Sequence, residues 1–430
     1  MKTNYMVKIK TAPETYTSAE ILFFAGWLFY TIYLFLASTM FITIFPMDDS
    51  VRNAFRLNMY AMVILKMFYC DRFSLKKTMV YGVILLVFLF SALISGYAYQ
   101  FDYMFLALGA YGVKNERLLK LYVKFTISLT LIVIVSSFFG IIENRQFFRT
   151  SGTVRNCFGF IYTTDFAAHI FYILLAVSCL KGKKFKFRDM GIYFLIAAAI
   201  LFFCDARLDA GLIILMAIGF MLYAKTRLFN YQIFKNILLF ATPVCCFFSI
   251  AVTALYRRTA FWKAFDSLTT GRLSLGWRNL KYYGIKPFGQ YIFQQGHGVL
   301  DFNSLYGYNF VDCGFLQVAL EYGSLVLILV VAAAVFTTYR FLKKGRTEVA
   351  LAIFFVALTS CFDHHILEIG YNPFLMMVFA SITPAVSGET YALFRKKEEE
   401  KEEEIYVAPV PVGLTYMRDV WYQVFKDGGK

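Results

Sequence analysis

Long apolar runs alternate with short polar segments along most of the chain. Residues 21–45, 81–94, 127–142 and 325–336 are apolar over almost their whole length. An α-helix needs about 20 predominantly apolar residues to cross a bilayer, and these runs lack the alternating pattern of an outer-membrane β-strand. The pattern therefore predicts membrane-spanning helices.

The same pattern, followed through the chain, predicts an all-α polytopic membrane protein. We expect about twelve transmembrane helices, at residues 20–45, 54–71, 78–98, 102–113, 119–142, 163–180, 190–204, 210–224, 236–255, 313–337, 349–362 and 366–388. A long loop between two of them, residues 256–312, is expected to carry short interfacial helices. No cleavable signal peptide is expected, because the first apolar run lacks a small-residue cleavage site.

Composition excludes a soluble globular protein. Of the 430 residues, 59% are hydrophobic and 17% are charged, whereas a soluble domain carries about 45–50% apolar and about 25% charged residues. The exception is the end of the chain, where residues 395–404 form a run of charges that cannot bury a core. We therefore expect a membrane domain at 1–394 and a charged tail at 395–430.

The basic residues indicate how the chain lies in the membrane. The net charge is +15, and most cations fall in alternate short loops, around residues 72–77, 114–120, 181–188, 225–235, 340–346 and 395–397. Because cytoplasmic loops are enriched in lysine and arginine, this side is expected to be cytoplasmic, with both termini inside. The charge is thus a topology signal, and a nucleic acid is not an expected partner.

Metal and nucleotide sites find little support in the sequence. The four histidines lack HExxH spacing and the eight cysteines form no CxxC pair, so we expect neither a metal nor another cofactor. The cysteines are interpreted as small packing residues. No GxGxxG or GxxxxGK[ST] loop indicates a nucleotide site.

The long loop breaks the charge rule, because seven basic residues lie on the side expected to be outside. Residues 269–284 predict a short helix whose apolar stripe could lie on the membrane surface, with Arg272 at its start and Arg278 on another face. Guanidinium groups match phosphate oxygens, so the hypothesis is a bound diphosphate. Two alternatives are an ordinary interfacial helix and a long loop that is translocated regardless of charge.

Two further arginines lie at the predicted outer boundary. Arg207 is flanked by Asp205 and Asp209 between two spans, and Arg155 lies with Arg149 in the outer loop that precedes residue 163. Charges at such depth are costly and commonly functional. A local structural Arg–Asp pair is the alternative.

Carboxylates and histidines on the same side are candidates for proton transfer. The candidates are Asp312, which opens a helix, and the cluster His364, His365 and Glu368; His297 in the long loop is another. Asp312 has the alternative role of a helix cap. Asp48 and Asp49 are interpreted as a turn beside a helix, with catalysis or metal binding as the alternative.

Five short motifs, in order, resemble those of the O-antigen polymerase/ligase superfamily, specifically Wzy-type bacterial polysaccharide polymerases. The resemblance covers about 140–380. It is carried by the segments Arg155…Phe158-Gly159-Phe160, Ala206-Arg207-Leu208, Gly271-Arg272, Asp312…Phe315-Leu316…Gly323 and His364-His365…Glu368…Asn372-Pro373. The first motif lacks the His-Pro-Asn that the family carries after its aromatic residues.

The resemblance implies a GT-C-like, metal-independent membrane glycosyltransferase. Its reaction would polymerise undecaprenyl-diphosphate-linked oligosaccharide units at the outer face of the bacterial cytoplasmic membrane, building a capsule or another polysaccharide, with inversion at the sugar. Arg155, Arg207, Arg272 and Arg278 would hold diphosphates. Asp312 or His297 would be the base, with His364, His365 and Glu368 as further candidates.

The expected partners are the lipid-linked donor and acceptor and membrane lipids, with a chain-length regulator as a further candidate. Two rival functions remain open. One is a ligase of the same superfamily that transfers glycan to another acceptor. The other is a polyprenyl-glycan transporter or flippase, although transporters commonly carry internal repeats and none is seen here.

Overall fold

A computed structural model describes residues 16–45, 47–149, 152–296 and 307–384 of the chain. These residues belong to one compact unit, Met1–Tyr391. The charged tail predicted at 395–430, and His297 in the long loop, lie outside the described residues.

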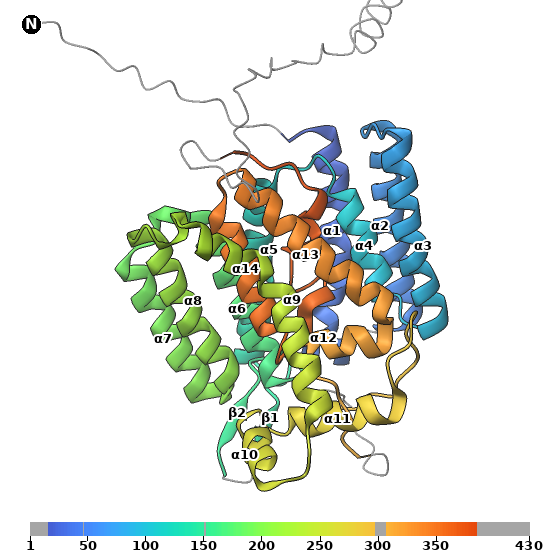
Figure 1. Cartoon of the computed structure of the whole chain (residues 1–430). Helices are drawn as coiled ribbons and strands as arrows, with labels where there is room; N and C mark the ends of the chain where they lie inside the picture. The colour runs from blue at the N-terminus through green and yellow to red at the C-terminus, as the bar shows by residue number, and fades with distance from the viewer. Residues whose placement is uncertain (1–15, 46, 150–151, 297–306, 385–430) are drawn as a thin grey trace, which may run out of the picture. The chain divides into compact units, whose positions relative to one another are not determined.

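Helices make up most of the described chain (Figure 1). Their bounds are α1 Ser18–Ala37, α2 Asp49–Tyr69, α3 Leu75–Ser95, α4 Tyr99–Gly109, α5 Asn115–Phe138, α6 Thr163–Lys181, α7 Phe187–Cys204, α8 Arg207–Lys225, α9 Gln232–Leu255, α10 Ala260–Leu268, α11 Arg272–Tyr283, α12 Gly314–Gln317, α13 Ser324–Lys343 and α14 Thr347–Thr359. One antiparallel hairpin, β1 Gln146–Phe148 and β2 Val154–Asn156, interrupts them. The sequence pattern did not predict this hairpin, which is too short to show an alternating pattern.

Within the described residues, eight helices are long and apolar enough to cross a membrane: α1, α3, α5, α6, α7, α8, α9 and α13. The chain is therefore an all-α, multi-pass membrane protein, as predicted. Four of the twelve predicted spans are not among these helices. The span predicted at 54–71 is the more polar helix α2, and α4 has only 11 residues.

The last two predicted spans, 349–362 and 366–388, differ most from expectation. Helix α14 has 13 residues, which corresponds to about 20 Å of helix against a hydrocarbon core of about 30 Å. After it the chain turns and comes back as short 3₁₀ turns, His365–Leu367 and Leu375–Phe379, instead of a continuous helix. Near its end, Ser381 pairs with Lys114 beside α5.

This irregular return segment, residues 360–382, is buried in the bundle, and side chains satisfy its backbone. The hydroxyl of Tyr103 donates to the Asn372 carbonyl (2.7 Å) and accepts from the Met376 amide (3.1 Å). The Tyr122 hydroxyl donates to the Tyr371 carbonyl at 2.6 Å. Non-helical backbone at membrane depth is tolerated only inside protein or along a water-filled cavity. The return segment is thus non-helical backbone inside a helical bundle, a feature that is often found along binding cavities.

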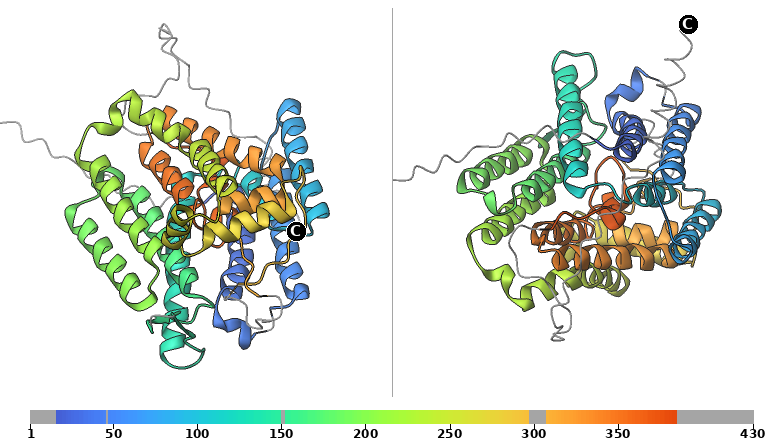
Figure 2. Two further views of the ribbon diagram at one scale, coloured as in Figure 1. Left: turned by 60° about the horizontal axis from the view of Figure 1, so that its bottom comes forward. Right: turned by 90° about the horizontal axis from the view of Figure 1, so that it is seen from above.

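Short loops gather at one end of the bundle and long ones at the other. We call the first end the basic face: there Arg346 pairs with Glu116 and Glu348 at 2.5 Å each, and Lys66 pairs with Asp71. We call the other end the loop face, which holds β1, β2, α10 and α11 at the bottom of Figure 1 and toward the viewer in the left panel of Figure 2.

The span predicted at 313–337 is broken near its start. Helix α12 continues into a π-helical turn, Val318–Tyr322, and α13 starts afresh after Gly323. The long loop crosses the break at Gly289, where an added Cβ would lie 1.9 Å from the Glu321 carbonyl oxygen. The Gln290 amide donates to that carbonyl at 3.0 Å. This glycine lets two backbones touch and fixes the long loop against α12.

The interpretation of Asp48 and Asp49 as a turn beside a helix can now be assessed. Asp48 caps α2 by accepting from the Val51 amide at 2.8 Å, and Asp49 pairs with Arg52, which agrees with a turn beside a helix. A buried carboxylate, Asp102 of α4, accepts from the Tyr30 hydroxyl (2.7 Å) and Arg56 (2.9 Å). Buried polar groups need such partners, and these contacts tie α1, α2 and α4 together.

Candidate functional site

Four arginines from three separate segments line one cavity of about 310 Å³ on the loop face. We call it the arginine cavity; its charged and phenolic lining residues are Arg149, Arg155, Tyr162, Asp205, Arg207, Asp209, Arg272, Tyr308 and Asp312. Three of the four arginines predicted to bind diphosphate, Arg155, Arg207 and Arg272, are therefore brought together. The described lining carries four arginines against three aspartates, so it retains an excess of positive charge.

Local structure explains how these cations converge. The β1–β2 hairpin carries Arg149 and Arg155, while Arg207 and Arg272 are the first residues of α8 and α11. Neither helix has a side-chain cap at its start, where the preceding residues are Ala206 and Gly271. The start of a helix presents free N–H groups and a partial positive charge, which favour an anion. The arginine side chains and the N-termini of α8 and α11 thus both make the electrostatic potential of the cavity positive.

Two of the arginines are anchored by the protein. Arg155 is largely buried; it donates to the Cys204 carbonyl (3.0 Å) and the Tyr162 hydroxyl (3.1 Å). Arg149 pairs with Asp205, which also binds Arg207 at 2.8 Å. The predicted Arg–Asp pair therefore exists, but Asp205 is shared between two arginines. The second flanking carboxylate, Asp209, lies in the cavity wall.

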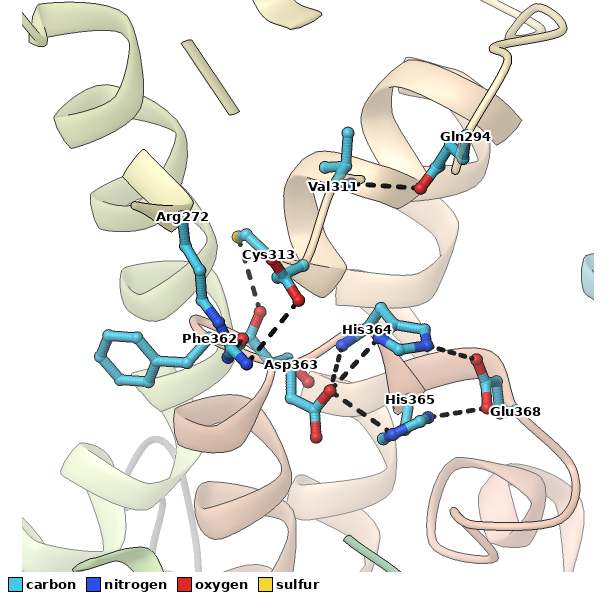
Figure 3. A network of polar contacts seen from close by, with 11 residues as sticks. Arg272, Gln294, Val311, Cys313, Phe362, Asp363, His364, His365 and Glu368 are labelled. Atoms are coloured by element: carbon cyan, nitrogen blue, oxygen red, sulfur yellow. Dashed lines mark hydrogen bonds and ion pairs between the residues drawn. The ribbon is translucent and has the colours of Figure 1, made fainter. Parts of the chain in front are cut away.

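The other two arginines, Arg207 and Arg272, differ in how exposed their side chains are. The side chain of Arg207 is 62% exposed, so its guanidinium is open to a ligand. Arg272 reaches inward and donates to the Phe362 carbonyl (Figure 3). It also lies 3.7 Å from Asp312. Arg272 thereby links the cavity to the turn after α14.

Arg278 does not belong to this group, contrary to the prediction. Its guanidinium donates to the Tyr308 carbonyl (2.8 Å) and the Asn309 side chain (2.9 Å), and the residue does not line the cavity. The apolar stripe of α11 is also not spread on a membrane surface. Leu273 is buried, and Gly276 packs so closely that a Cβ there would lie 2.9 Å from Leu316. Helix α11 is a packed part of the bundle.

A second cavity, of about 420 Å³, contains the predicted histidine cluster. We call it the histidine cavity; its polar and aromatic lining residues are Tyr33, Ser38, Tyr97, Tyr99, Asp165, Gln294, Phe310, Gln317, Glu321, Tyr322, His364, His365, Glu368 and Tyr371. It therefore combines ionisable groups, amides and aromatic rings, which are the side chains that bind carbohydrate hydroxyls and ring faces.

Four ionisable side chains form a closed ring at the wall of this cavity (Figure 3). His364 approaches Asp363 and Glu368 at 3.3 Å each. His365 approaches the same two carboxylates, at 3.5 Å from Asp363 and 2.7 Å from Glu368. Each imidazole therefore lies between two carboxylates.

The ring sets the charge of its members. Burial disfavours a charged imidazole, but Asp363 and Glu368 outweigh burial and raise the pKa of His365 to about 10. Burial also disfavours the carboxylate of Glu368, yet the two histidines outweigh burial and lower its pKa. At neutral pH, His365 is therefore a cation and not a free base.

The two cavities meet at the turn after α14. The Gly314 amide donates to the carbonyls of Ser360 (2.9 Å) and Asp363 (3.1 Å), and Arg272 holds the carbonyl of Phe362 between them. Asp363 points into the histidine ring, as Figure 3 shows. A movement of this turn would therefore change the position of lining residues in both cavities.

Two carboxylates are suited to proton transfer. Asp312 lines the arginine cavity, and burial raises its pKa, an effect that Arg272 partly offsets. Glu321 lines the histidine cavity, where burial raises its pKa to about 8. A pKa near the working pH is what general acid–base catalysis requires. Glu321 is the one carboxylate in the apolar stretch 314–337, and it was not among the residues predicted for the site.

Within the described residues, three members of this ring form the one group of side chains with the spacing to hold a metal ion. One ligand atom each of Asp363, His364 and His365 lie within 4.8 Å of one another. The independence from metals that the resemblance implies stays a prediction.

Sequence reasoning missed other members of the site. Asp165, at the start of α6, lines the histidine cavity, and Tyr371 stacks on His365 with ring centroids 3.8 Å apart. On its other face Tyr371 stacks on His169, also at 3.8 Å. A charged residue at the start of a predicted span was the available signal for Asp165; the ring stack depends on the tertiary fold.

The fold and the site define a multi-pass membrane protein with a cationic and a histidine–carboxylate cavity beside each other. In comparisons with known protein families, with curated proteins and with solved structures, no match to this chain is found.

Proposed function

We propose that the chain is a membrane glycosyltransferase that polymerises undecaprenyl-diphosphate-linked oligosaccharide units. The observation that carries the proposal is the convergence of Arg149, Arg155, Arg207 and Arg272 on one cavity that adjoins a histidine–carboxylate cavity. Planar guanidinium groups fit a diphosphate, and preorganised cations stabilise the charge that develops as it leaves. The alternative of a purely structural Arg–Asp pair does not account for four arginines in one wall.

In the proposed reaction the arginine cavity holds the diphosphate of the donor, and the histidine cavity holds sugar residues of the acceptor. Asp312 takes the proton from an acceptor hydroxyl. The hydroxyl oxygen then bonds to the anomeric carbon as the bond from that carbon to the diphosphate breaks, with inversion. The lipid diphosphate leaves as an anion among the arginines.

His365 has a different role in this scheme. Because its pKa is raised to about 10, it is protonated at neutral pH and cannot accept the acceptor proton. It holds Asp363 and Glu368 in place and offsets part of their negative charge. His364 and Glu368 complete this ring, and His297, outside the described residues, is a further candidate for the base.

The loop face would lie outside the bacterial cytoplasmic membrane and the basic face in the cytoplasm, as the positive-inside rule requires. Both termini would then be cytoplasmic. No nucleotide or metal enters the scheme, since the donor is already activated as a diphosphate.

The test is reconstitution. Lipid-linked repeat units would be extracted from cells that lack the protein and mixed with the purified chain in liposomes, without nucleotide and with a chelator present. The expected result is a ladder of lipid-linked oligomers. Transfer to an added non-lipid or lipid A-type acceptor would indicate a ligase, and movement of unchanged units between leaflets would indicate a flippase; either result without a ladder would overturn the proposal.

A further inference from the structure

A third cavity, of about 470 Å³, lies between α3, α4 and α13. Its walls are almost entirely apolar, and its floor is the irregular return segment, with Leu375, Val378 and Phe379. We call it the apolar cavity. Leu367 lines both this cavity and the histidine cavity, so the two adjoin.

The apolar cavity opens on the side of the bundle. Apolar lining residues of both helices are well exposed, such as Val80 of α3 by 56% and Phe336 of α13 by 49%. Both helices are candidate membrane spans, so in a membrane this opening would face the lipid. Deeper lining residues, such as Phe88 and Tyr103, are only 3% exposed.

Two cations mark one end of this cavity. Lys77 lies in the first turn of α3 and Arg340 in the last turn of α13, both at the basic face. Lys77 is exposed; its amino group is 3.3 Å from the Tyr111 hydroxyl. Arg340 donates to the carbonyls of Val378 and Ala380 at the cavity floor. The cavity is therefore apolar along its length and cationic at its end.

We propose that this cavity binds one phospholipid with an anionic headgroup, drawn from the leaflet at the basic face. The headgroup phosphate lies at Lys77 and Arg340, and an acyl chain follows α13 toward Leu367. Basic pockets between helices at the cytoplasmic side are suited to such headgroups. A lipid-linked diphosphate held at the loop face would have its anionic group at the opposite end, so the two cations favour the phospholipid.

The bound chain has a structural consequence. It packs against the return segment, which carries His364, His365 and Glu368 at its start. The lipid is thus positioned to stabilise the turn that both site cavities share. This inference is independent of the reaction proposed above.

The experiment measures lipid binding to the delipidated full chain by native mass spectrometry, with phosphatidylglycerol and phosphatidylcholine of identical acyl chains. The expected result is one phosphatidylglycerol held more tightly than phosphatidylcholine. Lys77→Gln weakens phosphatidylglycerol binding about fivefold and leaves phosphatidylcholine unchanged. The matched control is Lys76→Gln, an exposed neighbour that does not line the cavity.

A second arm tests the apolar part. Ala333→Phe, which fills the cavity, lowers binding of both lipids, whereas Ile328→Phe on the exposed side of α13 does not. Equal binding of the two lipids, or equal behaviour of the two lysine variants, overturns the proposal. Displacement of phosphatidylglycerol by polyprenyl diphosphate overturns it as well and assigns the cavity to the lipid-linked substrate. The surface lysine variants decide the question even if Ala333→Phe fails to fold.

Discussion

Replacing Arg207 by alanine should abolish most polymerisation while leaving the folded protein intact. The side chain of Arg207 is 62% exposed and makes one ion pair, with Asp205 at 2.8 Å. Exposed ion pairs contribute about 0–1 kcal/mol. Asp205 keeps its pair with Arg149, so the substitution leaves no uncompensated buried carboxylate. The free energy of unfolding should therefore change by less than about 1 kcal/mol.

The effect on the reaction should be much larger. Loss of one preorganised donor to the charge that develops in a transition state costs about 10²–10³ in kcat, or about 3–4 kcal/mol. Three arginines remain in the cavity, so the loss should not exceed this range. Arg207→Lys keeps the charge but loses the planar fork that binds two phosphate oxygens, and its rate should lie between those of the parent and the alanine variant.

The assay is the initial rate of oligomer formation from lipid-linked units in liposomes, measured beside the melting temperature. The matched control is Arg257→Ala, which removes an exposed cation of the long loop that does not line the cavity. An Arg207→Ala rate equal to that of the control would refute the reasoning. A melting temperature far below that of the control would assign Arg207 a structural role instead.

Further predictions concern the other site groups. Asp312→Asn should abolish transfer and leave donor binding unchanged. Glu321→Gln should retain activity and lose any rate change centred near pH 8. Retained activity in Asp312→Asn together with loss of activity in Glu321→Gln would assign the base to Glu321. Because the pKa of His365 is raised from 6.5 to about 10, its stabilising charge is fully present below pH 6.5 and is lost as the pH rises through about 10. The melting temperature should fall over that interval, and less so in His365→Gln. A chelator should leave the rate unchanged, whereas restoration of a lost rate by a divalent cation would indicate that the ring of Asp363, His364 and His365 binds metal.

The eight apolar helices were predictable because a membrane-spanning helix is defined by local composition, namely about 20 consecutive apolar residues. The return segment was not. Residues 374–380 are as apolar as a membrane-spanning helix, and the segment is irregular because partners far away in the chain satisfy its backbone. Tyr103 and Tyr122 bind its carbonyls although they are 269 and 249 residues distant in the chain. A local pattern contains no such information.

The arginines show the same limit at the level of the site. The sequence placed Arg155, Arg207 and Arg272 on one side of the membrane, and the structure brings them into one wall. Arg278 was grouped with them although it follows Arg272 by six residues. On a helix of 3.6 residues per turn, that spacing puts the two side chains about 120° apart around the helix axis. Helix geometry applied to α11 would have excluded Arg278.

The return segment also explains why the two site cavities belong together. A regular helix at 366–382 would satisfy its own backbone and would leave the hydroxyls of Tyr103 and Tyr122 without their present acceptors. The irregular path instead lets residues 363–368 place four ionisable side chains in one ring within six positions, which no helical face could do. Arg272 then joins that ring to the arginine cavity through the Phe362 carbonyl. The return segment is thus non-helical backbone enclosed by protein, and its irregular path is what allows the charged turn to form.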